Sequence, residues 1–120
     1  MSYTTLYSLE IRNYSSDLEL QQIFAALTGV REAGYALNLR VPSSSYDSRA
    51  KAKWYNHPQD MAALSKKFPT VLFVLEGAGE DISEPNFWRS YFQNGKYQRC
   101  KAELCYPEFD PTWTRNEGRL

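Results

Sequence analysis

The sequence predicts an α+β domain, a ferredoxin-like antiparallel sheet of four to five strands with two helices on one face. Three patterns support this: period-2 alternation of apolar residues, two segments with helical apolar spacing, and an Asn-Gly pair typical of a tight hairpin. The expected order is strand, helix, strand, helix and three strands, which suggests a βαββαβ plan with an added C-terminal strand. With 120 residues, the chain is expected to form a single domain over residues 1–120.

The first strand and the first helix follow from local patterns. Apolar and polar residues alternate over residues 3–11, as in a strand with one buried face. Ser16 stands three residues before Glu19, which is the spacing of a capping box, and apolar residues then recur with helical spacing until Gly29. We therefore expect a strand over residues 3–11 and a helix between Ser16 and Gly29.

A second strand is expected over residues 35–41, where apolar and polar side chains alternate until Pro42. Residues 42–53 contain three consecutive serines and then Arg49, Lys51 and Lys53, with no apolar period. We interpret this segment as a mobile connection.

A second helix and a central strand follow. Asn56-His57-Pro58 is typical of a helix start, with Asn56 or His57 as the cap, and the helix should end before Pro69. Residues 71–75 are an uninterrupted run of apolar side chains, the pattern of a strand buried on both faces. This strand is therefore expected at the centre of the sheet.

The clearest local signal is a hairpin around Asn94-Gly95, the preferred pair for a two-residue type I′ turn. If these residues form the turn, Phe92 lies opposite Tyr97 and Trp88 lies opposite Lys101. One face of the hairpin then carries aromatic and basic side chains together. The candidate binding residues on this face are Trp88, Phe92, Tyr97, Arg99 and Lys101. Beyond the hairpin, the Pro-rich residues 106–120 are expected to form an irregular tail with apolar side chains that could lie across the sheet.

Composition narrows the classes of function. The chain has 14 Lys plus Arg and 14 Asp plus Glu, so no overall field draws it to phosphates or to an anionic membrane. No run of residues approaches the length of a membrane span, and the N-terminus lacks the pattern of a signal peptide. Cys100 and Cys105 would point to opposite faces of one strand, which disfavours a disulfide. We expect a cytoplasmic protein.

Chemical sites are weakly indicated. His57 is the only histidine and is interpreted mainly as a residue that caps or flanks a helix, with an acid-base or ligand role as the alternative. One His and two Cys match no zinc spacing. The carboxylates Glu76, Glu80, Asp81 and Glu84 are interpreted as solvated loop charge, although such a cluster could hold a cation. Gly77-Ala78-Gly79 lacks the Lys of a phosphate loop. No catalytic residue, metal or cofactor is predicted.

The aromatic and basic hairpin face leaves three interpretations open. Its side chains could be cross-strand packing covered by the tail, or they could form a protein-binding surface, which favours aromatic residues and Arg. They could also bind single-stranded RNA or DNA, with bases stacked on the rings and phosphates paired with the cations. Against the third interpretation stand the zero net charge and the absence of the strand motif of RNA-recognition domains.

Several short motifs after residue 53 carry a family resemblance. They include Trp54-Tyr55-Asn56-His57, Leu64-Ser65-Lys66-Lys67-Phe68-Pro69, Leu75-Glu76-Gly77, Asn94-Gly95-Lys96 and Pro107-Glu108-Phe109-Asp110. This part, about half of the chain, resembles small uncharacterised proteins of phages, plasmids and bacterial genomes, some with a ferredoxin-like domain. The resemblance implies no catalytic residues. It implies a protein that binds a host protein, as inhibitors of bacterial defence systems such as anti-CRISPR proteins do.

The leading hypothesis is therefore a non-enzymatic binding protein of phage or mobile-element type that acts on a host protein in the host cytoplasm. The first alternative is a single-stranded RNA- or DNA-binding module that uses the same hairpin face. The second is a small enzyme of unknown reaction, which would depend on His57 and the carboxylates near Glu80.

Overall fold

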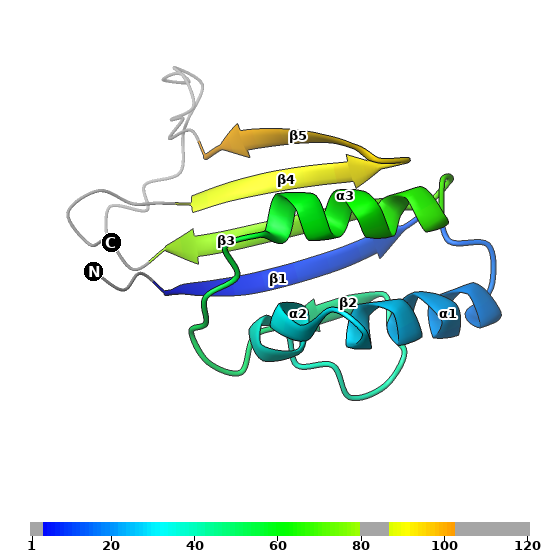
Figure 1. The fold of residues 1–120 in the computed structure, drawn as a ribbon, viewed down its shortest axis with the longest axis horizontal. Coiled ribbons are helices and arrows are strands. Elements are labelled where there is room, and N and C mark those ends of the chain that lie inside the picture. Colours follow the sequence, from blue (N-terminus) through cyan, green and yellow to red (C-terminus); the bar gives the residue numbers. More distant parts are fainter. Residues whose placement is uncertain (1–3, 80–86, 103–120) are drawn as a thin grey trace, which may run out of the picture.

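The structure is a computed structural model that describes residues 4–79 and 87–102. The described residues form one five-stranded antiparallel sheet with strand order β2-β1-β3-β4-β5, and three helices (Figure 1). The elements in chain order are β1 (Thr5–Arg12), α1 (Asp17–Thr28), α2 (Arg31–Ala36), β2 (Ser45–Asp47), α3 (His57–Lys67), β3 (Leu72–Gly79), β4 (Phe87–Gln93) and β5 (Lys96–Lys101).

The α+β class is confirmed, and the helices lie on one face of the sheet, with α3 in front of β3 and β4 and with α1 and α2 in front of β2 (Figure 1). The ferredoxin-like arrangement is not confirmed. A βαββαβ plan places two strands between its helices, whereas here one strand, β2, lies between α2 and α3 and three strands follow α3. The structure also has a helix, α2, that the sequence patterns did not predict.

The strand expected over residues 35–41 is wrong. Tyr35 and Ala36 belong to α2, and residues 37–44 lie in the connection to β2. Ala33, Ala36 and Leu37 are fully buried, at the i, i+3, i+4 spacing of a helix, whereas Tyr35 and Val41 are exposed. The alternation along the sequence was therefore fortuitous, because burial follows the helical period of α2.

Residues 42–53, which were interpreted from the sequence as a mobile connection, include a short strand of the sheet. It contains β2, which pairs with β1 through Leu9 and Tyr46, and Ala52 forms a further bridge to Thr5. Tyr46 is buried, and its hydroxyl accepts a hydrogen bond from Ser43 N (2.8 Å). A strand of three residues with a single buried side chain has no period that a sequence could reveal.

The remaining elements agree with the patterns. Ser16 caps α1 by accepting a hydrogen bond from Glu19 N, Asn56 is the N-cap of α3, and β3 is the central strand of the sheet. The apolar run of residues 71–75 lies in a longer strand than expected, since β3 continues through Gly79.

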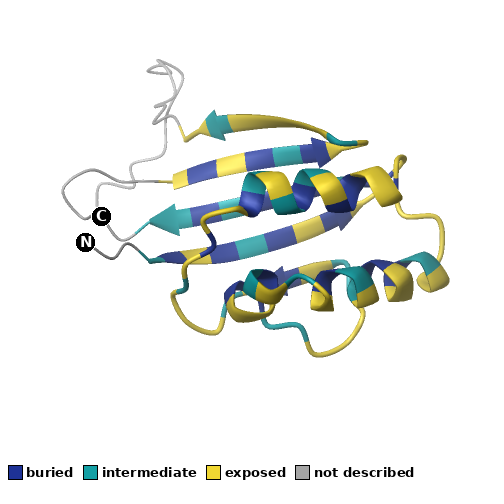
Figure 2. Cartoon of the chain, in the orientation of Figure 1, coloured by how far each residue is buried: buried dark blue, intermediate teal, exposed yellow. Residues whose placement is uncertain are grey.

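The core lies between the helices and the sheet face that they cover. Alternate residues of β1, β3 and β4 point into it, as the banding of these strands in Figure 2 shows. Residues of α1 and α3 pack against them from the other side. The fully or almost fully buried side chains include Leu9, Ile11, Ile23, Leu27, Met61, Leu64, Phe73, Leu75 and Phe92.

The β4–β5 turn has the predicted conformation and is attached to α3. Asn94 and Gly95 have φ angles of 49° and 82°, both positive as a type I′ turn requires. The Gly95 N–H donates a hydrogen bond to Ser65 Oγ (2.8 Å), and Ser65 is fully buried on α3. The hairpin is therefore held against the helix at its turn as well as along its strands.

Candidate interaction surface on strand β5

The hairpin pairs in the predicted register. Phe92 lies opposite Tyr97, Ser90 opposite Arg99 and Trp88 opposite Lys101. All five candidate binding residues therefore lie on one face of the hairpin, which is the face toward the helices because Phe92 and Trp88 are part of the core.

Burial divides these five residues into two groups. Trp88 and Phe92 are 7% and 0% exposed, so neither ring can form part of an open surface. This corrects the expectation of an exposed aromatic face. Tyr97 is 55% exposed, and Arg99 and Lys101 are exposed as well. We call Tyr97, Arg99 and Lys101 the β5 strip.

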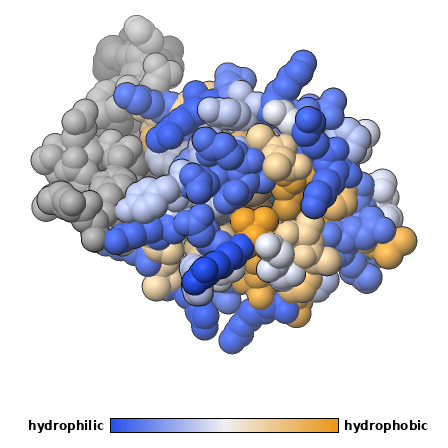
Figure 3. Space-filling view, in the orientation of Figure 1, coloured by the Kyte–Doolittle hydropathy of each residue, from blue (hydrophilic) through white to orange (hydrophobic). Residues whose placement is uncertain are grey.

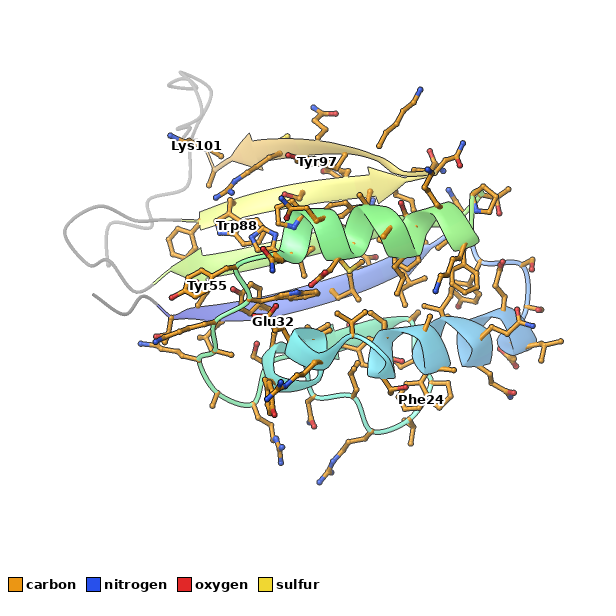
Figure 4. The ribbon with its side chains drawn as sticks, in the orientation of Figure 1. Phe24, Glu32, Tyr55, Trp88, Tyr97 and Lys101 are labelled. Carbon is orange, nitrogen blue, oxygen red and sulfur yellow. The ribbon has the colours of Figure 1, made fainter. Side chains whose placement is uncertain are left out.

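The two buried rings support the exposed side chains of the β5 strip. Tyr97 is stacked on Phe92, with ring centroids 5.6 Å apart and planes inclined by 27°. The guanidinium carbon of Arg99 lies 4.8 Å from the centre of the Trp88 ring, within the range of a cation–π contact. Figure 4 shows Tyr97 and Lys101 on β5 and Trp88 on the neighbouring strand. Because they rest on buried rings, Tyr97 and Arg99 lose less side-chain entropy when a partner binds.

His57, the first residue of α3, contacts the Trp88 ring. It is 8% exposed, and its imidazole is stacked on the Trp88 indole with ring centroids 4.7 Å apart. Burial, together with the charge of Arg99, lowers the pKa of His57 to about 4, while Asp60 acts in the opposite direction. The imidazole is therefore neutral near pH 7, and its Nδ1 has no hydrogen-bond partner among the described residues. His57 is the first residue of α3, next to the Asn56 cap, which agrees with its interpretation as a residue that caps or flanks a helix, and its ring also packs against Trp88.

All the charged side chains of the hairpin are positive. Residues 87–102 contain the four cations Arg89, Lys96, Arg99 and Lys101 and no carboxylate. Arg89 points to the face away from the helices, where its Nε donates a hydrogen bond to Glu76 (2.6 Å). Within the described part of the chain, Arg99 and Lys101 form no ion pair. The β5 strip therefore carries two cations that no carboxylate of the described residues neutralises.

The space-filling view gives the same distribution. In Figure 3 the hydrophobic side chains gather between the helices, whereas the border over β4 and β5 is mainly hydrophilic. The partly buried apolar residues that pack against the core include Phe24, Val30 and Ala62.

The backbone of the β5 strip faces outward. Ala102 N donates to Phe87 O (3.1 Å), so this pair belongs to the hydrogen-bonded pairs of the β4–β5 ladder. Such pairs alternate with pairs that exchange no hydrogen bonds. Cys100, Gln98 and Lys96 therefore bond toward β4, while the N–H and C=O groups of Tyr97, Arg99 and Lys101 point to the edge of the sheet. β5 pairs only with β4 in the part of the chain that the structure describes.

The opposite face of the sheet has a groove of about 580 Å³. Exposed apolar side chains, among them Leu6 and Phe87, line it together with Tyr91 and the ion-paired Arg89 and Glu76. Hydrogen bonds to Tyr91 and Glu76 raise the pKa of Arg89 above its ordinary value. The cation on this face is neutralised, in contrast to those of the β5 strip.

Other sequence-based expectations concern catalysis and ligands. No three His, Cys, Asp or Glu side chains of residues 4–79 and 87–102 are grouped as a metal site. Glu80, Asp81, Glu84, Cys105 and the tail 106–120 lie outside the described residues, whereas Cys100 is a free thiol. Over the same described ranges, no helix has both the length and the apolar character needed to cross a membrane.

Two parts of this surface escaped sequence analysis. The contact of His57 with Trp88 joins residues 31 positions apart in the chain and has no local signal. The outward backbone groups of β5, in contrast, follow from the hairpin phase, so the Asn94-Gly95 turn could have revealed them.

Comparison with known proteins gives no relatives: no protein-family model matches the chain, and neither the curated proteins nor the solved structures contain a significant match.

Proposed function

We propose that this chain is a non-enzymatic binding protein that acts through protein–protein interaction, with the β5 strip at the centre of its binding surface. One observation carries the proposal: Tyr97 and Arg99 are exposed yet rest on the buried rings of Phe92 and Trp88. Tyr and Arg are the residues most often found as energetic centres of protein interfaces, and a pre-positioned side chain binds at a lower entropic cost.

The burial of Trp88 and Phe92 favours a protein over a single-stranded nucleic acid as the partner. Single-strand binders stack successive bases on several exposed rings along a charged groove. On this face of the hairpin, Tyr97 is the one exposed aromatic side chain among the described residues. One ring with two cations suits a protein interface better than a track for several bases.

The partner class follows from the resemblance to small proteins of phages, plasmids and bacterial genomes. We propose a host protein in the bacterial cytoplasm, with components of defence systems, the targets of anti-CRISPR proteins, as the first to examine. A fold alone does not determine function, so the lysate experiment described next has to identify the partner.

The test is affinity capture from a bacterial lysate, with and without nuclease treatment, followed by mass spectrometry. The bait is compared with a double variant, Arg99→Gln with Lys101→Gln. The matched control is Lys67→Gln with Lys96→Gln, which removes the same charge from the end of α3 and from the opposite face of β5. We expect a captured protein that survives nuclease, is lost with the first variant and remains with the control.

Two results would contradict the proposal. Capture that disappears after nuclease treatment, with an affinity that falls steeply as salt is added, would indicate nucleic-acid binding, because phosphate contacts release counterions. Capture that is equal for both double variants would place the interface away from the β5 strip.

A further inference from the structure

We infer that the partner of β5 is an extended acidic segment that adds to the sheet as a further strand beside β5. This inference rests on the proposed function and specifies the mode of binding. In strand addition, main-chain hydrogen bonds supply affinity and alternate side chains supply specificity. β5 offers both contributions through the same three residues.

The first requirement is a row of available backbone groups. Tyr97, Arg99 and Lys101 direct their N–H and C=O groups to the outer side of the sheet, as the bond between Ala102 and Phe87 fixes the phase of the ladder. No described residue bonds to these groups. They form a template for an added strand over the length of β5.

The second requirement is a side-chain preference. The side chains of the β5 strip share one face, and residues directly opposite each other on paired strands share a face as well. A residue opposite Arg99 or Lys101 would therefore meet a cation that no described carboxylate neutralises. Opposite charges at such positions stabilise the pairing of strands, and like charges destabilise it. An acidic strand is the complementary partner.

The same cations disfavour a second copy of this chain as the occupant. If two β5 strands paired antiparallel about Arg99, the two Arg99 side chains would lie opposite each other, and Tyr97 would face Lys101. Edge cations are a recognised means of preventing such self-association. The positive charge of β5 thus disfavours pairing with the β5 strand of a second copy, and it favours pairing with an acidic strand.

The test uses a short synthetic peptide in which Glu alternates with Thr. In an antiparallel complex, the arrangement of every strand pair in this sheet, the Glu residues should lie opposite the β5 strip, and their N–H groups should bond to β5. The peptide is therefore compared with one form that is N-methylated at the Glu residues and another N-methylated at the Thr residues. A peptide with Lys in place of Glu tests the charge. Binding is followed by amide hydrogen exchange and chemical shifts in NMR spectra of the full chain.

We expect the parent peptide and the Thr-methylated form to bind, and the Glu-methylated and Lys forms to bind at least about tenfold more weakly. The amides of Tyr97, Arg99 and Lys101 should become protected on binding, whereas those of Gln98 and Cys100 should be protected already in the free protein.

Several outcomes would overturn the inference. Equal binding of the two N-methylated forms, or unchanged exchange at the β5 strip, would show that side chains alone make the contact. Equal binding of the Lys peptide, or no binding of the Glu peptide up to about 1 mM, would remove the acidic strand as the partner. None of these results affects the lysate capture, so the proposed function can stand while strand addition fails.

Discussion

The indole of Trp88 lies directly over the backbone of Gly77, its partner on β3. A Cβ added at Gly77 would overlap the Nε1 side of this indole. The absence of a side chain at residue 77 therefore allows Trp88 to lie where it can contact both His57 and Arg99.

Gly77→Ala should destabilise the protein by about 1–3 kcal/mol, because the added methyl group forces the indole out of a packed position. Urea unfolding measures the effect. Gly34→Ala is the matched control: it lies in α2, where a Cβ would meet no heavy atom within 4 Å. The control should be neutral or stabilising by up to about 1 kcal/mol, because Ala favours helix over Gly. Equal effects of the two substitutions would show that Trp88 does not depend on Gly77.

His57 should make stability depend on pH. Its pKa is about 4 in the folded protein and about 6.5 in an unfolded chain. Between these values the unfolded state binds the proton first, so the free energy of unfolding should fall as the pH decreases from about 6.5 to about 4. The contribution of this group should be about 3 kcal/mol in total and should be fully present above pH 6.5.

The control for this pH effect is His57→Phe, which keeps a flat ring against Trp88 and cannot titrate. The difference between the two proteins in urea unfolding, measured over this pH window, isolates His57 from the carboxylates. A constant difference would mean that the imidazole remains accessible to protons in the folded state.

Ser65→Ala should cost about 1–2 kcal/mol in unfolding free energy, because it leaves the Gly95 N–H without its acceptor on α3. Thr28→Ala is a close control. Both hydroxyls donate to the carbonyl three residues earlier in a helix, but Thr28 is exposed and accepts no hydrogen bond from another element among the described residues. The control should change stability by less than about 0.5 kcal/mol. If Ser65→Ala is equally mild, the turn does not depend on α3.

Substitutions of Phe92 and Tyr97 should distinguish the buried ring that supports the hairpin from the exposed ring that binds a partner. Phe92→Ala removes a fully buried ring and should cost about 3–5 kcal/mol, whereas Tyr97→Ala removes an exposed ring and one stacking contact, about 0.5–1.5 kcal/mol. Circular dichroism and urea unfolding report stability, and lysate capture reports binding. Tyr97→Ala should lose capture while it remains folded. Unimpaired capture by Tyr97→Ala would remove this ring from the interface.

Much of the fold could be predicted because its signals are local. The Ser16 cap, the start of α3 at Asn56 and the Asn94-Gly95 turn depend on neighbouring residues, and all three are confirmed. The strand over residues 35–41 was wrong because its alternation competed with the helical spacing of Ala33 and Ala36. β2 was missed because tertiary contacts of one residue, Tyr46, determine its place.

For the candidate surface, the register of the strands could be predicted from the sequence, but the exposure of the side chains could not. The hairpin register placed Trp88 and Phe92 on the correct face, since register follows from the turn. Their exposure could not be predicted, because it depends on α3 lying across β3 and β4, and helix placement is a tertiary property (Figure 1). The sequence patterns therefore predicted which face each ring lies on, but they did not predict that Trp88 and Phe92 are buried while Tyr97 is exposed.

The two borders of the sheet differ in a way that limits how large an assembly can grow. β2 is three residues long, and Asn38 N already donates to the Asp47 carbonyl on its outer side (2.9 Å). A fibril that grows by edge-to-edge stacking needs two open borders on each subunit. Among the described strands, β5 is the border whose outward backbone groups are unpaired along its length, so strand addition at β5 should stop at one partner per molecule and should not polymerise.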